Sequence, residues 1–505
     1  MLGPLFAGGS AGPEFVLSTA GESATLAGAR LLESIDRAAS QLVARGVCAG
    51  DRVMHCGEQG PAAFIAFWAC VRLGAAFVPV DPSWAETLRR LALRKIGPRA
   101  LVVGDASERA RWHALDGALP TLQFEMDSLA AGTAAAASET GAALPREFDS
   151  GIPAACLFTS GTTAEPKAVV LSRGALVRSA VLAVRTFEWS AGERLLNLPD
   201  PQSMSGLRNA FLAAPLAGMH WVCAPRSRRT DIFALLELLQ QARPQRIVAA
   251  PLLLRQINLL GERVPSGLLA ETRAMYCTGT DLSVPEVSAF FERFHIPVIN
   301  YYGLTESVGL CLSQRLAGWS HSDTSLGWPA GCEIRIVDAE GLPVSAGTAG
   351  ELRIRQEWPM SGYLGDPEAT AQCFTGGWLR TGDIVRQHQD GRITLVGRRS
   401  NFIKTQGTER VHPLEIETVL EQHANIAEAA VCGLPQPAGG ESIAAVLVPR
   451  AGWQPTGPEL KAIANFVSDR LGRERAPAVF RCVTQIPRNT SGKILRHTLR
   501  ELFNA

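Results

Sequence analysis

Segments with the period of a helix alternate with short apolar runs through most of this chain, and this alternation restricts the fold more than any other feature. Pro61 to Leu73 has the pattern of a helix, and Ala76 to Val80 and Ala100 to Val103 have that of buried strands. Ile232 to Ala242 and Val284 to Phe294 are again predicted as helices, each followed by an apolar strand. Helices and strands that alternate in this way cover a mostly parallel sheet. The sequence therefore predicts an α/β fold.

The pattern changes near residue 327, after which apolar and polar residues alternate in short runs. Ile334 to Asp338 and Glu351 to Arg355 are predicted as antiparallel strands. From about Ser400 helix and strand candidates return. We therefore expect a large N-terminal domain of mixed sheets and packed helices over 1–399, with a β-rich subdomain over about 327–399. A small, mobile α+β domain is expected over 400–505.

The balance of charges argues against some classes of partner. Lysine and arginine total 49, aspartate and glutamate total 48, and the net charge is +1. This gives no electrostatic reason to expect nucleic acid or an anionic membrane as a partner. The longest apolar candidate for a membrane span, Pro61 to Pro82, contains Arg72 and is interrupted by Gly74 and Pro79. Eleven cysteines without a Cys-x-x-Cys pair indicate free thiols, and we expect a soluble, cytoplasmic protein.

The stretch Leu157 to Ser172, LFTSGTTAEPKAVVLS, combines small hydroxyl residues and a glycine with one lysine. It is not an ordinary P-loop, because Pro166 stands at the second glycine and Ala168 follows the lysine. Its flanks are both strand-like. Hydroxyls, open amides and a lysine can still bind a polyphosphate, although a mobile surface hairpin with incidental Ser and Thr is the alternative. The candidate phosphate ligands are Thr159, Ser160, Gly161, Thr162, Thr163 and Lys167.

Four further stretches carry residues that suit nucleotide chemistry. INYYGLTES, Ile299 to Ser307, offers an aromatic ring that can stack on a base, a hydroxyl for phosphate and a carboxylate for magnesium. An aspartate in WLRTGDIV can bind both hydroxyls of a ribose. LVGRRSNFIKTQG and PRNTSGKILR each add one basic residue. The residues concerned are Tyr302, Thr305, Glu306, Asp383, Arg398 and Lys493.

These stretches, in this order and spacing, resemble the adenylate-forming superfamily from about Leu31 to Arg496. That family includes acyl- and aryl-CoA ligases, adenylation domains of nonribosomal peptide synthetases, and firefly luciferase. RLGAAFVPVDP, Arg72 to Pro82, also matches a family stretch. The resemblance implies a reaction in two halves. A carboxylate attacks the α-phosphate of ATP to give an acyl-adenylate and pyrophosphate, and the thiol of CoA or of a carrier-bound phosphopantetheine then takes the acyl group.

The resemblance also implies roles for single residues. Thr159 to Thr163 and Lys167 would hold phosphates, Tyr302 would stack on adenine, and Gly279 would line the same pocket. Thr305 would touch the α-phosphate, Glu306 would hold Mg²⁺, and Asp383 and Arg398 would bind ribose. Lys493 would bridge the carboxylate and the α-phosphate and stabilise the charge that grows there. Ser400 would be the hinge of the C-terminal domain, and Gly407 would border the thiol tunnel.

The chain departs from the family pattern in several places. Ala164 and Ala168 stand where glycine is usual, and a methyl there would stiffen the phosphate loop. Ser400 replaces the usual Asp or Lys, and the segment after Gly407 is one residue longer than usual. These departures leave open a non-catalytic or regulatory member that binds nucleotide without turnover. A luciferase-like oxygenase is a third reading that no residue singles out.

The stretch Leu196 to Gly218 is expected to build part of the acid pocket, with Ser203, Met204 and Gly303 facing the substrate. The histidine usual in acyl-CoA ligases is absent, since the chain has Pro-Asp-Pro-Gln over 199–202. The aspartate that grips an α-amino group is also absent, with Ser205 near its place. We therefore expect a small aryl or short acyl acid as substrate, with ATP and Mg²⁺ as cofactors and CoA or a separate acyl carrier protein as acceptor.

Overall fold

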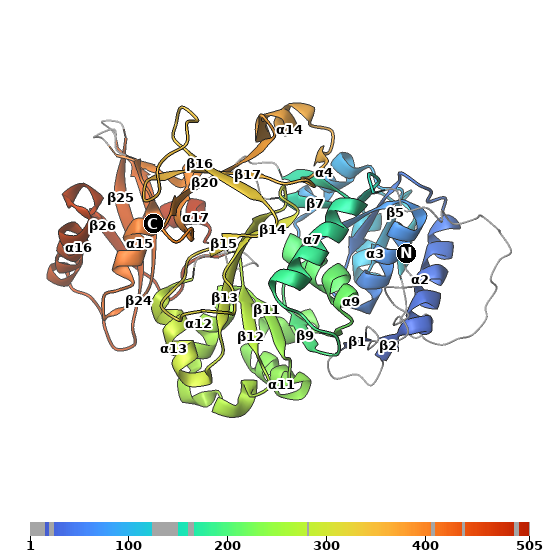
Figure 1. Ribbon diagram of the computed structural model, residues 1–505, viewed down its shortest axis with the longest axis horizontal. Coiled ribbons are helices and arrows are strands. Elements are labelled where there is room, and N and C mark those ends of the chain that lie inside the picture. The colour runs from blue at the N-terminus through green and yellow to red at the C-terminus, as the bar shows by residue number, and fades with distance from the viewer. Residues whose placement is uncertain are drawn as a thin grey trace.

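The computed structural model describes residues 16–19, 25–123, 150–159, 166–279, 282–405, 410–436, 440–488 and 494–503. Figure 1 shows an elongated molecule with α2 (Gly28–Val43) near one end and the C-terminal part at the other. Between these ends lie two mixed sheets, the helices that pack on them and a third, antiparallel sheet.

The first mixed sheet has the strand order β18-β8-β7-β4-β3-β5-β6 over the described residues. Its strands are β3 (Arg52–Cys56), β4 (Ala76–Val80), β5 (Ala100–Val103), β6 (Thr121–Gln123), β7 (Pro153–Thr159), β8 (Lys167–Ser172) and β18 (Gly362–Tyr363). The pairs among β3 to β7 are parallel, and β8 and β18 join antiparallel. In the hairpin of β7 and β8, Thr159 lies opposite Lys167. The two ends of the predicted phosphate loop are therefore fixed by a ladder of backbone hydrogen bonds.

The second mixed sheet has the order β15-β14-β13-β12-β11-β9-β10-β1-β2 in the described part of the chain. Its strands are β1 (Val16–Thr19), β2 (Thr25–Ala27), β9 (Arg194–Asn197), β10 (His220–Cys223), β11 (Arg246–Ala249), β12 (Ala274–Cys277), β13 (Val298–Leu304), β14 (Gly309–Ser313) and β15 (Trp328–Pro329). β13 is parallel to β12 and then pairs antiparallel with β14. The turn between β13 and β14 carries Thr305 and Glu306. This hairpin places both residues at the edge where the sheet changes direction.

Helices fill the space between the two sheets and cover their outer faces. One buried cluster joins residues of both sheets, such as Phe77 and Tyr276, to residues of α3 and α7. A second cluster packs α11, α12 and α13 on the other face of the second sheet, through side chains such as Leu238 and Phe290. The bounds are α3 (Pro61–Leu73), α4 (Glu86–Ile96), α5 (Ala106–His113), α7 (Arg173–Thr186), α10 (Arg226–Thr230), α11 (Ile232–Ala242), α12 (Pro251–Leu260) and α13 (Val284–Phe294), with 3-10 turns η2 (Gly261–Arg263) and η3 (Ser266–Leu269).

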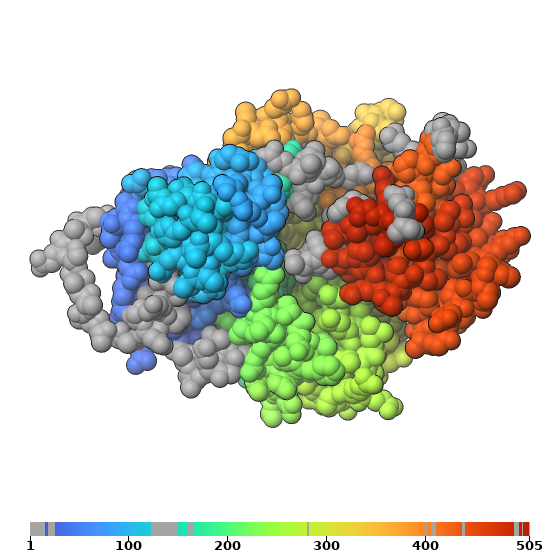
Figure 2. Space-filling view, turned by 180° about the vertical axis from the view of Figure 1, so that it is seen from behind, coloured from blue at the N-terminus to red at the C-terminus, as the bar shows by residue number. Residues whose placement is uncertain are grey.

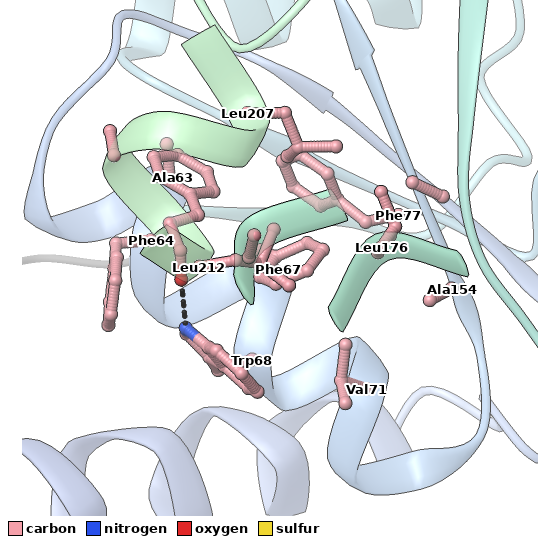
Figure 3. Packing of buried hydrophobic residues seen from close by; sticks show 14 of the residues in the cluster. Ala63, Phe64, Phe67, Trp68, Val71, Phe77, Ala154, Leu176, Leu207 and Leu212 are labelled. Atoms are coloured by element: carbon pink, nitrogen blue, oxygen red, sulfur yellow. Dashed lines mark hydrogen bonds between the residues drawn. The ribbon is translucent and has the colours of Figure 1, made fainter. Parts of the chain in front are cut away.

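A π-helix, η1 (Leu207–Ala213), lies in this core between α8 (Met204–Gly206) and α9 (Ala214–Ala217). It packs against α3, which is apolar on every side and buried along nearly its whole length. Trp68 of α3 donates a hydrogen bond from its indole nitrogen to the carbonyl of Phe211, at 3.1 Å (Figure 3). Figure 3 also shows Leu207 and Leu212 of η1 beside Phe64 and Phe67. The π-helix is therefore held firmly by the core.

The antiparallel sheet has the order β16-β17-β20-β19, with β21 paired to β20. Its elements are β16 (Glu333–Val337), β17 (Ala349–Arg355), α14 (Pro367–Cys373), β19 (Phe374–Thr375), β20 (Trp378–Gln387) and β21 (Ile393–Arg398). The C-terminal part consists of η4 (Arg399–Asn401), β22 (Ile403–Lys404), β23 (Arg410–Val411), α15 (Pro413–Leu420), β24 (Ile426–Pro435), β25 (Glu441–Pro449), α16 (Gly457–Leu471), η5 (Arg473–Arg475), β26 (Val479–Cys482) and α17 (Arg496–Glu501). These two regions have the β-rich and α+β characters that the sequence predicts.

The α/β class is confirmed, with a large N-terminal part and a smaller C-terminal one. The helix Pro61–Leu73 and the strand Ala76–Val80 have the predicted bounds. The apolar strand expected after the helix Val284–Phe294 continues to Leu304, because pairing with β14 extends it beyond the parallel sheet. The π-helix was not predicted. The domain boundary between residues 399 and 400 stays a prediction.

Candidate active site

A cavity of about 1050 Å³ opens where the two mixed sheets, η1 and the antiparallel sheet meet. The face in Figure 2 is hollowed between the N-terminal segments in blue, the middle segments in green and the C-terminal part in red. The predicted site residues that line the cavity are Thr159, Lys167, Ser203, Met204, Gly279, Gly303, Thr305, Glu306 and Arg398. The candidates Ser160, Gly161, Thr162, Thr163, Gly407 and Lys493 lie outside the described residues, and Ser400 is in the turn η4.

The described residues that are predicted to bind phosphate lie at the strand ends of the β7–β8 hairpin. Thr159 and Lys167 face each other across the hairpin and both line the cavity. The ammonium of Lys167 lies 4.8 Å from the centre of the Tyr363 ring, within the range of a cation–π contact. Ala168 is a buried residue of β8 and pairs with Phe158. Its methyl therefore packs in the core, and the effect of Ala168 on the stiffness of the loop stays a prediction.

Tyr363 was missed by the sequence analysis and connects two predicted residues. Its hydroxyl donates a hydrogen bond of 2.9 Å to a carboxylate oxygen of Glu306 and lies 3.2 Å from the thiol of Cys373. Partial burial and the neighbouring Glu306 carboxylate raise the pKa of the Tyr363 hydroxyl, so it remains a donor. The Tyr363 side chain thus contacts two opposite charges. The Lys167 ammonium lies over its ring, and the Glu306 carboxylate accepts a hydrogen bond from its hydroxyl. No local sequence signal marks Tyr363, because only the pairing of β18 with β8 brings it here.

The predicted nucleoside residues form a closed network behind the cavity wall. The Tyr302 hydroxyl donates to one oxygen of Asp383 at 2.5 Å, and Nε of Arg398 donates to the other at 2.9 Å. Asp383 and Arg398 are paired residues of β20 and β21. Burial, and then the Asp383 charge, raise the pKa of Tyr302 well above its usual value. Arg398 lines the cavity, whereas Tyr302 and Asp383 do not.

The three residues predicted for the acid pocket, Ser203, Met204 and Gly303, line the cavity. Ser203 caps α8, since its hydroxyl accepts a hydrogen bond of 3.0 Å from the amide of Gly206 and donates to the carbonyl of Asp200 at 2.8 Å. A Cβ on Gly303 would come within 1.8 Å of the Gly309 carbonyl oxygen, so only glycine fits there. Gly303 therefore allows β13 and β14 to approach closely at the cavity wall.

Arg208 of η1 also lines the cavity and was missed by the sequence analysis. Its side chain is fully buried, and neither terminal nitrogen has a hydrogen-bond partner among the residues that the structure describes. Burial lowers the pKa of this guanidinium, while the nearby Tyr301 phenol opposes that shift. A single charged residue in the apolar stretch GLRNAFLAAPLAG was a visible signal. Its inward direction depends on the π-helix, which the sequence pattern does not predict.

Comparison with known families decides what this site belongs to. The family model described as AMP-binding enzyme matches residues 11–364, and that of the AMP-binding enzyme C-terminal domain matches residues 415–493. The chain belongs to the AMP-binding enzymes. The predicted resemblance to adenylate-forming enzymes is therefore confirmed.

Individual relatives of this AMP-binding enzyme agree along nearly their whole length. It is 30% identical over 481 residues to the indoleacetate–CoA ligase of Aromatoleum aromaticum, which covers 94% of this chain and 92% of the relative. It is 28% identical to a fatty acid–[acyl-carrier-protein] ligase of Streptomyces coeruleorubidus, with 95% and 92% covered. The structure of the ATP-bound RpMatB-BxBclM chimera B1 superposes with a TM-score of 0.89 at 25% identity, with 99% of this chain and 97% of the chimera covered.

The enzyme is thus an acid–thiol ligase. It activates a carboxylic acid with ATP to an acyl-adenylate, releases pyrophosphate and transfers the acyl group to a thiol. Within the described ranges, no three His, Cys, Asp or Glu side chains gather as metal ligands. In the same ranges, every helix is too short or too polar to pass through a lipid bilayer.

Proposed function

We propose that this AMP-binding enzyme activates a small aryl or short acyl acid and transfers it to CoA. The observation that carries the proposal is that the same cavity is lined by the ends of β7 and β8, the Thr305–Glu306 turn, Arg398 and the acid wall with Ser203 and Met204. An acid placed between Met204 and Thr305 is beside the turn predicted to hold the α-phosphate. Proximity of this kind converts a bimolecular attack into an effectively unimolecular one.

The nucleotide is proposed to extend from the β7–β8 hairpin to the β20–β21 pair. Thr159, Lys167 and the residues Ser160 to Thr163 bind the phosphates, and Thr305 binds the α-phosphate. Tyr302 and Gly279 form the adenine side, and Asp383 with Arg398 binds the ribose. The Tyr302–Asp383 hydrogen bond supports this assignment, because it fixes both side chains at the nucleoside end before a ligand arrives.

Glu306 suits the predicted role of Mg²⁺ ligand. It is a carboxylate on the cavity wall, its orientation is fixed by the Tyr363 hydroxyl, and its other oxygen remains available as an acceptor. Mg²⁺ is commonly held by one or two carboxylates plus substrate phosphates and water. When bound, the ion would neutralise charge on the phosphates. Glu306 would then serve as the protein ligand, with Tyr363 holding its position.

Lys493 is proposed to bridge the acid carboxylate and the α-phosphate. The negative charge on this phosphate grows as the carboxylate attacks, and an ammonium fixed beside it lowers the barrier. The C-terminal domain that carries Lys493 is proposed to rotate about Ser400 between the two halves of the reaction. Gly407 then borders the path of the thiol.

Different observations support the proposed class of acid and the proposed thiol acceptor. The inner end of the acid wall is polar, with Ser205, Tyr301 and Arg208 close together, and a long aliphatic chain would desolvate these groups without replacing their hydrogen bonds. The indoleacetate–CoA ligase supports both an aryl acid and CoA. All eleven cysteines are free, which supports the reducing, cytoplasmic location that CoA chemistry uses.

Exchange of labelled pyrophosphate into ATP, dependent on an added acid, tests the first half of the proposal. The panel contains aryl, short acyl, long-chain and α-amino acids. We expect exchange with aryl or short acyl acids, and exchange with only long-chain or amino acids would contradict the substrate class. With the best acid, thioester formation is then compared for CoA and for a phosphopantetheinylated carrier protein. Faster transfer to the carrier would contradict CoA as acceptor.

A further inference from the structure

Six arginines line the cavity within the described part of the chain, and one of them differs from the rest. The ion pairs are Arg226–Asp81 at 3.1 Å, Arg229–Asp200 at 2.7 Å, Arg398–Asp383 at 2.9 Å, and Arg380 and Arg399 with Glu351 at 3.7 and 3.8 Å. Arg208 forms no ion pair with any described residue, although it is the most deeply buried of the six.

The environment of Arg208 leaves its charge without compensation. Its exposed fraction is 0%, and its Nη1 and Nη2 atoms are buried without an acceptor in the described part of the chain. The rings of Tyr301 and Phe187 lie 5.8 and 5.9 Å from the guanidinium carbon, at the outer limit of cation–π contact. A charge taken out of water at this depth destabilises the fold unless it is paired and hydrogen-bonded. A ligand that brings an anion would supply the missing partner.

Arg208 is one of the residues that line the cavity, and its guanidinium packs against two others. A Cβ placed on Gly309 would come within 2.7 Å of Nη1 and 3.1 Å of the Met204 side chain, and Gly309, Met204 and Arg208 all line the cavity. Gly309 also has a φ of +96°, in the region that favours glycine. The absence of a side chain at residue 309 therefore allows Nη1 to pack directly against the backbone of Gly309. Because Met204 is one of the residues expected in the acid pocket, this contact places the guanidinium at the acid end of the site.

A polar network fixes the direction of the guanidinium. Nε of Arg208 donates to the side-chain oxygen of Asn209 at 2.9 Å, and the Asn209 amide donates to the Ser205 hydroxyl at 3.3 Å. Ser205 in turn is hydrogen-bonded to the Tyr301 hydroxyl at 2.6 Å. The network uses Nε and leaves both terminal nitrogens for a ligand. Such preorganisation is typical of a binding group rather than of a structural charge.

We propose that Arg208 binds a second carboxylate of the acid substrate, at the end remote from the carboxyl that is activated, so that the enzyme prefers small dicarboxylic acids. The inference rests on the proposed function and narrows its substrate class. The two terminal nitrogens of a guanidinium match the two oxygens of a carboxylate. A neutral hydroxyl or keto group would fill one hydrogen bond and leave the charge without a counterion.

The test compares pyrophosphate–ATP exchange with matched acids of nearly equal shape. Terephthalate is compared with p-toluate and p-hydroxybenzoate, and succinate with butyrate. For the wild type we expect kcat/KM about 10- to 100-fold higher for one or both diacids than for the matched monoacids, the range of a charge-assisted hydrogen bond. Arg208→Met is expected to abolish or reverse this ratio, and Arg208→Lys to retain part of it. Arg178→Met, at an exposed arginine paired with Glu357 at 3.1 Å, is the matched control and should leave the ratio unchanged.

Two results would overturn the inference while the proposed function stands. One is exchange that is equal for diacids and monoacids and has the same ratio in Arg208→Met. The other is a preference for p-hydroxybenzoate over terephthalate. Absence of exchange with every acid would refute the proposed function and this inference with it. Binding without turnover gives an independent readout, since the diacid should raise the melting temperature of the wild type and of Arg178→Met but not that of Arg208→Met.

Discussion

The two ends of the proposed site differ in whether the charged side chains there have partners. At the nucleoside end Asp383 accepts hydrogen bonds from both Tyr302 and Arg398, so the charges are balanced before a ligand arrives. At the acid end Arg208 is fully buried and has only the Asn209 oxygen as an acceptor among the described residues. The first end can contribute to the stability of the free enzyme. The unpaired charge of Arg208 at the second end lowers that stability, and an anionic ligand would compensate the charge.

An arginine in a cavity wall is not by itself evidence of ligand binding. What matters is whether its guanidinium already forms an ion pair within the protein. Arg226 and Arg229 line the same cavity and are paired with aspartates. Pairs of this kind are common at protein surfaces and shape the wall without demanding a ligand. A buried cation whose terminal nitrogens have no acceptor is rare and needs an explanation.

The largest effect is expected at the junction of the two ends, where Lys493 is proposed to bridge the nucleotide and the acid. Lys493→Ala should lower acid-dependent pyrophosphate exchange about 10²- to 10³-fold, because the charge that grows on the α-phosphate loses its stabilising ammonium. Thioester formation from a supplied acyl-adenylate should change little. Stopped-flow or quench measurements of the two halves separate these steps.

Lys461→Ala is the control for this experiment, because Lys461 is an exposed residue of α16 in the same C-terminal part. It should leave both halves unchanged. Equal losses in both halves for Lys493→Ala would contradict the bridging role. They would indicate that the substitution acts on the fold or the movement of the domain instead.

The next largest effect is expected on the free energy of unfolding, when the shared acceptor at the nucleoside end is removed. Asp383→Ala leaves Arg398 and the Tyr302 hydroxyl without their shared acceptor, so the nucleoside end becomes as uncompensated as the acid end. We expect a loss of about 3 kcal/mol in the free energy of unfolding, measured by urea denaturation, and a rise in the KM for ATP. An unchanged free energy of unfolding would show that water replaces the carboxylate and that the balance is of no energetic importance.

Arg208→Met provides the opposite change at the unbalanced end. Methionine keeps much of the volume and removes a buried charge that has no counterion, so the free energy of unfolding should rise by about 2 kcal/mol. The same urea titration measures it. The clearest test of the comparison is that Arg208→Met should raise the free energy of unfolding, whereas Asp383→Ala should lower it. Destabilisation by Arg208→Met would mean that the contacts with Asn209 and the Tyr301 ring outweigh the uncompensated charge.

The sequence predicts best what depends on local pattern. Pro61–Leu73 and Ala76–Val80 have their predicted bounds because long apolar segments leave a single way to bury them. The motif residues Thr305, Glu306 and Lys167 are brought together at one cavity, as expected from their chemistry. These residues lie at or next to strand ends, and the sequence shows such ends as the points where an apolar run stops.

What the sequence does not predict depends on pairing between distant segments. Tyr363 reaches Glu306 only because a two-residue strand pairs with β8, nearly two hundred positions earlier in the chain. Arg208 belongs to the π-helix η1, whose side-chain directions differ from those of the α-helix that an apolar pattern predicts. The hydrogen bond between Tyr302 and Asp383 likewise joins two motifs that the sequence presents separately.

The smallest expected effect tests the single hydrogen bond that joins those two motifs. Tyr302→Phe removes the hydroxyl and keeps the ring, while Arg398 still compensates Asp383, so the loss should be about 1 kcal/mol in the free energy of unfolding. Because the ring remains, the KM for ATP should rise less than with Tyr302→Ala, which removes the proposed stacking surface as well. The two variants are compared in the same exchange assay at varied ATP. An equal rise in KM for both would assign the role of Tyr302 to its hydroxyl alone, and would make the nucleoside end a site that is completed by Asp383 rather than by an aromatic face.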